Sequence, residues 1–195
     1  MTAWRYIGEI TLLQAQFYEM TGKGSYDLDA LTSVERLRLT PDGPLGLIGD
    51  TWIVDRHHRY HPDARHWHAQ DVLSFGFTSH YEHMGDMFRP LPVGHAGENV
   101  IVETRDLLSL EDIAGGIMVE TPRGAVEFAT PTVMEPCVEF TRFITNRPDA
   151  SATDVNPSRQ KLRKGVRGYS VGITNPEPVD LTTGLRVSVR RAQPG

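Results

Sequence analysis

The sequence predicts a mainly β domain, a barrel with a few short peripheral helices, and three observations support this expectation. The length of 195 residues suits one domain. The content of 39% hydrophobic and 23% charged residues is typical of a globular protein. The 18 glycines and 13 prolines divide the chain into short segments, many of them of strand length. We therefore expect residues 1–195 to form a single domain built from many short strands.

The expected strands are short apolar or alternating segments separated by turn residues. They are residues 7–18, 34–39, 99–103, 116–121 and 124–130. Pro41-Asp42-Gly43-Pro44 predicts a turn after the second of these strands, and residues 45–54 then resume an apolar run. Pro122-Arg123-Gly124 predicts a hairpin between the last two strands. Residues 168–174 and 185–190 alternate apolar and polar side chains, and we expect them to close the fold as an antiparallel pair.

Two short helices are predicted from capping signals. Ser79 and Glu82 have the spacing of a capping box, and apolar residues then recur at helical spacing, so we expect a helix over residues 79–88. Ser109 and Asp112 have the same spacing and predict a single helical turn.

The segment after Pro136 is expected to begin as a helix and to continue as a surface loop. A proline at or just before the first turn favours a helix over residues 137–145. Residues 146–158 are polar and contain Pro148 and Pro157. We therefore expect them to form a surface loop.

The composition excludes several classes of protein. No apolar run approaches the roughly 20 residues that a membrane helix needs, and the start MTAWRYIGEI lacks the apolar core of a secretory signal. The single cysteine, Cys137, cannot form an internal disulfide, which favours a cytoplasmic location. The net charge of -5 gives no general electrostatic reason to expect nucleic acid or a membrane surface as a partner.

Cys137 is the first candidate functional residue, because it follows a predicted strand and begins a predicted helix. Unpaired amide groups at the start of a helix stabilise negative charge on sulfur. A cysteine in this place can be a nucleophile, a persulfide carrier or a soft metal ligand. The alternative is a buried cysteine that acts as a small hydrophobic residue.

The second candidate is the segment from Gly94 to Asn99. Its two glycines allow the backbone to approach an anionic ligand closely, and Asn99 can both donate and accept hydrogen bonds. It lacks the Lys-Ser/Thr end of a phosphate loop, and no helix is predicted after it. A tight turn, with Glu98 and Asn99 satisfying local backbone groups, is the alternative.

All eight histidines lie between His57 and His95, and this clustering is a third candidate feature. They are His57, His58, His61, His66, His68, His80, His83 and His95. In an extended chain His66 and His68 face the same side, and His80 and His83 are one turn apart on the predicted helix. Either pair would begin a divalent metal site, although the sequence has no HExxH motif and no second cysteine. Solvated surface histidines are the alternative, with one or two as proton donors.

A basic run from Arg159 to Arg167 contains five cations in an otherwise acidic chain. Such a run usually forms a solvated helix face. Its functional alternative is a clamp for an anion, and Arg167 is best placed for this role because it directly precedes the predicted strand at 168–174.

Taken in order, these segments resemble the MOSC domain, the C-terminal domain of molybdenum cofactor sulfurases that also occurs as stand-alone bacterial proteins. The resemblance spans most of the chain. It rests on residues 39–46 followed by Gly49-Asp50 or Asp55-Arg56-His57, on residues 94–99, on Glu135-Pro136-Cys137 with Phe140, and on Arg167-Gly168-Tyr169. The Gly-Glu-Asn element followed by Pro-Cys is its most specific part.

The resemblance implies a β-barrel that binds molybdenum cofactor or carries sulfur. Cys137 occupies the position of the family's proposed sulfur carrier or molybdenum ligand. Cofactor contacts are implied for a further set of residues, namely Arg56, His57, His95, Gly97, Glu98, Asn99 and Arg167. Cys137 and His57 are the candidate catalytic residues. The chain has no desulfurase segment and no iron–sulfur cysteines, so a sulfur donor or an electron-donor protein would act in trans.

Three functions remain open from the sequence. The first is a molybdenum-cofactor-binding or sulfur-carrier protein, in one form part of a reductase of N-hydroxylated small molecules. The second is a metal- or acid/base-dependent lyase or hydrolase that uses the histidine-rich segment from His57 to His95. The third is a non-catalytic module that binds an anionic small molecule.

Overall fold

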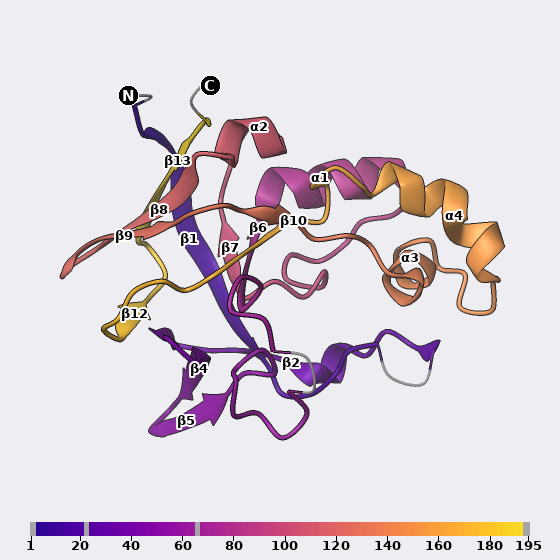
Figure 1. Ribbon diagram of the computed structural model, residues 1–195. Coiled ribbons are helices and arrows are strands. Elements are labelled where there is room, and N and C mark those ends of the chain that lie inside the picture. Colours follow the sequence, from indigo (N-terminus) through magenta and orange to yellow (C-terminus); the bar gives the residue numbers. More distant parts are fainter. Residues whose placement is uncertain (1–2, 22–23, 65–66, 193–195) are drawn as a thin grey trace.

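The computed structural model describes residues 3–21, 24–64 and 67–192 and is mainly β, as expected (Figure 1). The larger sheet is curled into a half-barrel. Its strands, in order across the sheet, are β10 (Thr132–Val133), β11 (Tyr169–Val171), β6 (Leu73–Phe77), β7 (Val100–Val102), β1 (Arg5–Gln16), β13 (Arg186–Arg190), β8 (Gly116–Thr121) and β9 (Gly124–Phe128), and β2 (Leu31–Ser33) pairs with the end of β1. All described pairs are antiparallel except β6 with β7.

A second, four-stranded sheet contains the predicted turn at residues 41–44. Its order is β12 (Val179–Leu181), β3 (Arg36–Thr40), β4 (Gly43–Ile48) and β5 (Thr51–Val54). Thr40 and Gly43 face each other across the turn, which confirms the turn expected from the Pro-Asp-Gly sequence.

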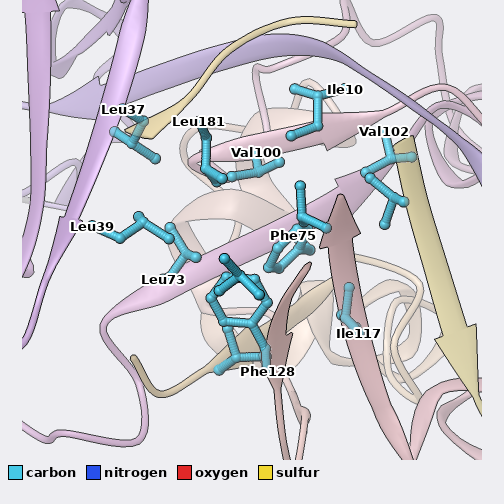
Figure 2. Packing of buried hydrophobic residues seen from close by; sticks show 14 of the residues in the cluster. Ile10, Leu37, Leu39, Leu73, Phe75, Val100, Val102, Ile117, Phe128 and Leu181 are labelled. Carbon is cyan, nitrogen blue, oxygen red and sulfur yellow. The ribbon is translucent and has the colours of Figure 1, made fainter. Parts of the chain in front are cut away.

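The main hydrophobic core lies between the two sheets (Figure 2). Leu37 and Leu39 of β3 pack with residues of the curled sheet such as Phe75 and Phe128, all of them at most 1% exposed. Burial of each such side chain contributes about 1.5–3 kcal/mol. This core joins the two sheets along their inner faces.

The four α-helices of the described residues are short, and two of them contribute buried residues to a second hydrophobic cluster. They are α1 (Thr78–Met87), α2 (Leu110–Ile113), α3 (Val138–Ile144) and α4 (Ala152–Lys161), with a 3-10 turn η2 (Leu28–Ala30). In β7, Val100 and Val102 enter the main core while Ile101 points to the helices, where it meets Met84 and Phe140. Burial on both faces explains why β7 is apolar throughout. No helix among the described residues is long and apolar enough to span a membrane.

Several predicted elements are confirmed. The strand at 7–18 appears as β1, the hairpin at 116–130 as β8 and β9, and the helix at 137–145 as α3. The turn at Ser109 is α2, with the expected reciprocal capping bonds between Ser109 and Asp112.

The predicted capping box at Ser79 is wrong, although the helix itself is present. The N-cap of α1 is Phe77, and no side chain caps it. The Ser79 hydroxyl instead bonds Thr104 Oγ1 at 2.7 Å and the Asp106 carbonyl at 2.8 Å. Because α1 follows β6 directly, its first turn is buried and Ser79 fastens it to the segment after β7.

The surface loop predicted over residues 146–158 is wrong in its second half. Residues 146–151 form a mostly exposed loop, but helix α4 begins at Ala152, with Ser151 as N-cap and a reciprocal bond to Asp154. Pro157 lies inside the helix and removes one backbone donor, but Val155 is fully buried. Packing of α4 against α3 therefore outweighs the helix-breaking effect of the proline.

The predicted pairing of residues 168–174 with 185–190 is wrong as well. β11 pairs with β6 and β10, whereas β13 pairs with β1 and β8. Alternation predicts that a segment is a strand, but it does not identify the partner strand. β6 itself was missed, because all five of its residues are buried and give no alternating pattern.

Candidate functional site

A cavity of about 270 Å³ brings together residues that are far apart in the sequence. Its described lining includes Cys137, Arg167, His57, Gly97 and Asn99, all of which the sequence singled out. A larger groove of about 1180 Å³ runs along β1 and residues 103–106 but contains none of the predicted site residues. The smaller cavity is therefore the candidate site.

Cys137 is the N-cap of α3 and lines the cavity. Its Sγ accepts a hydrogen bond from the Phe140 N–H at 3.3 Å. The thiol is free and half-buried. The carbonyl of Cys137 accepts from Thr141 Oγ1 at 2.7 Å, which fixes the start of the helix. The sulfur is thus held in a defined position while it stays within reach of a ligand.

Arg167 enters the cavity from the segment before β11. Its Nε and Nη2 donate to the Ala96 carbonyl at 3.3 and 3.0 Å, and its guanidinium lies 4.8 Å from the Phe140 ring centroid. Burial alone would lower the pKa of Arg167, but attraction to Tyr26, Cys137 and nearby acidic groups raises it overall. Arg167 is therefore a fixed, permanently charged cation that interacts electrostatically with the cysteine sulfur.

Glu98 lies behind the cavity wall and is fully buried. Tyr81 donates to Glu98 Oε2 at 2.5 Å, whereas Oε1 has no hydrogen-bond partner among the described residues. Burial raises the pKa of Glu98 to about 7, against the lowering effects of Tyr81 and Arg167. A side chain at Gly76 would place its Cβ 2.8 Å from Glu98 Cδ, so this glycine leaves the space that the carboxyl group occupies.

Asn99 has a structural role in addition to its place in the lining. Its Oδ1 accepts from the amide and hydroxyl of Ser74, at 3.2 and 3.0 Å. Its Nδ2 donates to Asp55 Oδ2 at 3.0 Å and to the Gln14 carbonyl at 3.3 Å. These bonds use the hydrogen-bonding capacity of the amide, so Asn99 shapes the wall rather than offering a free group to a ligand.

His57 lines the cavity, whereas Arg56 and His95 do not. Asp55 Oδ1 lies 2.9 Å from His57 Nδ1, which orients the ring and leaves Nε2 as the other polar atom. Arg56 forms an ion pair with Glu19 at 3.0 Å. His95 is half-buried, and burial together with the nearby charge of Arg89 lowers its pKa.

The remaining histidines are dispersed. Among the residues the structure describes, no three His, Cys, Asp or Glu side chains gather as a metal site. His80 is buried and accepts the Leu108 N–H at 3.0 Å, so it does not join His83 as a ligand pair. His61 contacts the Phe17 carbonyl at 2.8 Å, and His68 is exposed. His66 lies outside the described residues.

Tyr26 lines the cavity, although no sequence motif points to it. Its ring packs against Phe140 and Phe143, with centroids 5.3 and 5.0 Å apart. Its hydroxyl oxygen is buried beside Gly97 and has no hydrogen-bond partner among the described residues. Burial raises the pKa of Tyr26 well above its ordinary value, although Arg167 acts in the opposite direction. The hydroxyl is therefore a neutral donor.

Comparison with known proteins identifies the fold but no sequence relative. No family model and no curated protein matches the chain. The YuaD protein from Bacillus subtilis superposes with a TM-score of 0.61 at 15% identity, covering 98% of this chain and 100% of YuaD. A hypothetical protein gives 0.53 at 13% identity, covering 96% and 69% of the two chains. YiiM from Escherichia coli gives 0.51 at 14% identity, covering 95% and 71%.

YuaD and YiiM are MOSC-domain proteins. At these identities the similarity concerns the fold alone. The architecture described above, a curled half-barrel with short helices behind it, is consistent with theirs. The fold of this chain is MOSC-like.

Proposed function

We propose that this chain is a sulfur-handling protein in which Cys137 either carries sulfane sulfur as a persulfide or ligates the molybdenum of molybdenum cofactor. The observation that supports this proposal is the shared cavity of Cys137 and Arg167. The Cys137 sulfur accepts the Phe140 N–H, and Arg167 places a positive charge in the same cavity. Persulfide formation and binding of a soft metal both use the sulfur as an electron-pair donor.

The residues present fit the metal-binding part of molybdenum cofactor better than its phosphate. The Cys137 sulfur is a soft ligand of the kind that molybdenum accepts. Arg167 is the only arginine or lysine in the described lining, and it would face the anionic part of the cofactor. Arg56 is paired with Glu19 and lies outside that lining. The bound group would supply a redox-active metal.

The chain's own residues have distinct roles in this proposal. Cys137 holds the sulfur or the metal, and Arg167 holds negative charge beside it. His57, oriented by Asp55, exchanges a proton with the ligand through Nε2. A sulfur donor acts in trans in the carrier form, and an electron-donor protein does so in the form that reduces N-hydroxylated small molecules. A free thiol used in this way suits a reducing compartment such as the cytoplasm.

Elemental and sulfur analysis of the protein from a cofactor-competent host tests the proposal. Wild type and Cys137→Ser are purified side by side and assayed for molybdenum and for sulfane sulfur released by cyanide. The proposal requires at least one of the two in wild type and its loss in Cys137→Ser. Equal molybdenum in both proteins, without sulfane sulfur in either, would overturn it.

The same samples test the histidine-based alternative. A lyase or hydrolase of that kind would contain stoichiometric zinc or iron that is unaffected by Cys137→Ser. The dispersal of the described histidines argues against this alternative. A module that only binds an anion would contain neither metal nor sulfane sulfur.

A further inference from the structure

Two side chains of the cavity, those of Tyr26 and Arg167, indicate a ligand in addition to the sulfur or metal held by Cys137. The Tyr26 hydroxyl is buried without a partner among the described residues. The Arg167 Nε and Nη2 donate to the Ala96 carbonyl, and the guanidinium lies close enough to the Tyr26 hydroxyl to act against the raised pKa of that tyrosine. Both side chains line the cavity that contains Cys137. A fixed cation and a neutral donor beside a thiol form the wall of an anion site.

The two carboxyl groups of the lining are hydrogen-bonded. Glu19 accepts from Arg56 at 3.0 Å and from Thr21 Oγ1 at 2.8 Å. Asp71 accepts from Ser170 Oγ at 2.8 Å and from Thr132 Oγ1 at 3.1 Å. Arg167 is the one arginine or lysine in the described lining.

The size of the cavity restricts the ligand. Its volume of about 270 Å³ is below the ~300–1,000 Å³ typical of sites for drug-sized molecules. A side chain at Gly97 would place its Cβ 2.9 Å from Met20 Sδ, so the wall leaves no spare room there. The enclosed part of the ligand is therefore small.

We propose that Arg167 and Tyr26 form an oxyanion subsite beside Cys137, and that its ligand is a small sulfur oxyanion with a transferable sulfur, of the thiosulfate class. This inference rests on the proposed sulfur-carrier function and names its sulfur donor. The Cys137 thiolate attacks the outer sulfur of thiosulfate, and a new S–S bond forms. The S–S bond of thiosulfate breaks, and its electron pair leaves with sulfite. Charge and electrons balance without an external oxidant or reductant.

Alkylation of Cys137 with a charged and a neutral reagent tests the subsite without any assay of activity. Cys137 is the only cysteine, so iodoacetate and iodoacetamide label one position. We expect the ratio of the iodoacetate rate to the iodoacetamide rate to exceed that of free cysteine by about tenfold, as in other charge-lined clefts. A ratio equal to that of free cysteine would overturn the subsite.

Two variants and a matched control assign the effect to residues. Arg167→Gln is expected to abolish the iodoacetate preference, and Tyr26→Phe to reduce it severalfold. Tyr6→Phe alters an exposed tyrosine in the separate groove along β1 and should retain the wild-type ratio. Because Arg167 also holds the Ala96 carbonyl, its variant is first checked for folding by circular dichroism. If Arg167→Gln does not fold, Tyr26→Phe alone tests the subsite. A ratio of iodoacetate to iodoacetamide rates in Tyr26→Phe equal to that in Tyr6→Phe would then show that Tyr26 does not contribute to an oxyanion subsite, and would overturn the proposal.

Thiosulfate itself tests the ligand class. The reduced protein should gain one sulfur atom at Cys137, seen by intact mass, with one equivalent of sulfite released. An iodoacetate preference without this transfer would overturn the thiosulfate class. Sulfane sulfur on the purified protein without an iodoacetate preference would overturn the subsite but leave the carrier function standing. If the wild type prefers iodoacetate but contains no molybdenum and accepts sulfane sulfur from no donor, the carrier function is overturned while the oxyanion subsite stands.

Discussion

Asn99 Nδ2 donates a hydrogen bond to Asp55 Oδ2 at 3.0 Å, and the two side chains are 2% and 0% exposed. Asp55 also accepts from the Gln16 amide at 2.7 Å and from the His57 amide at 2.8 Å. This carboxylate therefore joins β1, the segment after β5 and the segment before β7. It fixes two walls of the cavity to each other.

Replacement of Asp55 by alanine should destabilise the fold by at least about 3 kcal/mol, because several buried donors would lose their acceptor at about 1–3 kcal/mol each. Urea unfolding of wild type and Asp55→Ala measures the difference. Asp50→Ala is the control, since Asp50 is exposed and its loss should change stability by no more than about 0.5 kcal/mol. Equal effects of the two substitutions would contradict a structural role for Asp55.

Glu98→Gln should remove a dependence of stability on pH. Burial raises the folded pKa of Glu98 to about 7 from its ordinary 4.5, so the unfolded state releases this proton more readily. The stability that Glu98 contributes is therefore lost as pH rises from about 4.5 to 7, and the difference in stability between wild type and Glu98→Gln changes by about 3 kcal/mol over this range.

Urea unfolding at a series of pH values measures this loss. Glu177→Gln changes an exposed carboxyl and should follow the wild-type profile. The prediction fails if Glu98→Gln and wild type run parallel from pH 4.5 to 7.

His80 should make stability depend on pH in the opposite direction to Glu98. Burial lowers its folded pKa to about 4 from 6.5, and its Nε2 accepts the Leu108 N–H, which requires the neutral ring. The unfolded state binds this proton more readily, so stability contributed by neutral His80 is lost as pH falls from about 6.5 to 4. His80→Gln keeps an acceptor without a titration and should be less sensitive to acid by about 3 kcal/mol.

The effect of His80 is measured by the same titration with His68→Gln as control, since His68 is exposed. In the wild type the slopes of His80 and Glu98 oppose each other over most of this range. Each becomes visible only in the variant that lacks the other. A His80→Gln profile with the wild-type acid sensitivity would show that another group is responsible.

Much of the fold and part of the site could be predicted from the sequence, because strand alternation and Pro-Gly turns are local signals. The hairpin at 116–130 and the helix that begins at Cys137 are of this kind. The sequence left Gly49-Asp50 and Asp55-Arg56-His57 as alternatives, and their surroundings differ only through the fold, which places Asp55 against Asn99. Asp50 lies exposed in the turn between β4 and β5, whereas Asp55 is buried.

Tyr26 and Arg56 show the limit of local patterns in opposite ways. Tyr26 reaches the site only through its packing on Phe140 and Phe143, which no short motif encodes. Arg56 looked suited to bind an anion, but the fold places Glu19 beside it. Both outcomes depend on contacts between distant segments, which tertiary structure alone determines.

Gly97→Ala should both destabilise the protein and narrow the cavity. The φ of Gly97 is +93°, a conformation that costs a side-chain-bearing residue about 1–3 kcal/mol. The added Cβ would lie 2.9 Å from Met20 Sδ and 3.3 Å from the Tyr26 hydroxyl. Gly184→Ala is the matched control, because Gly184 has a φ of +82° and open space around it. We expect both variants to lose stability in urea, but only Gly97→Ala to slow alkylation of Cys137 by iodoacetamide, by severalfold. Equal alkylation rates in the two variants would show that Gly97 does not shape access to the thiol.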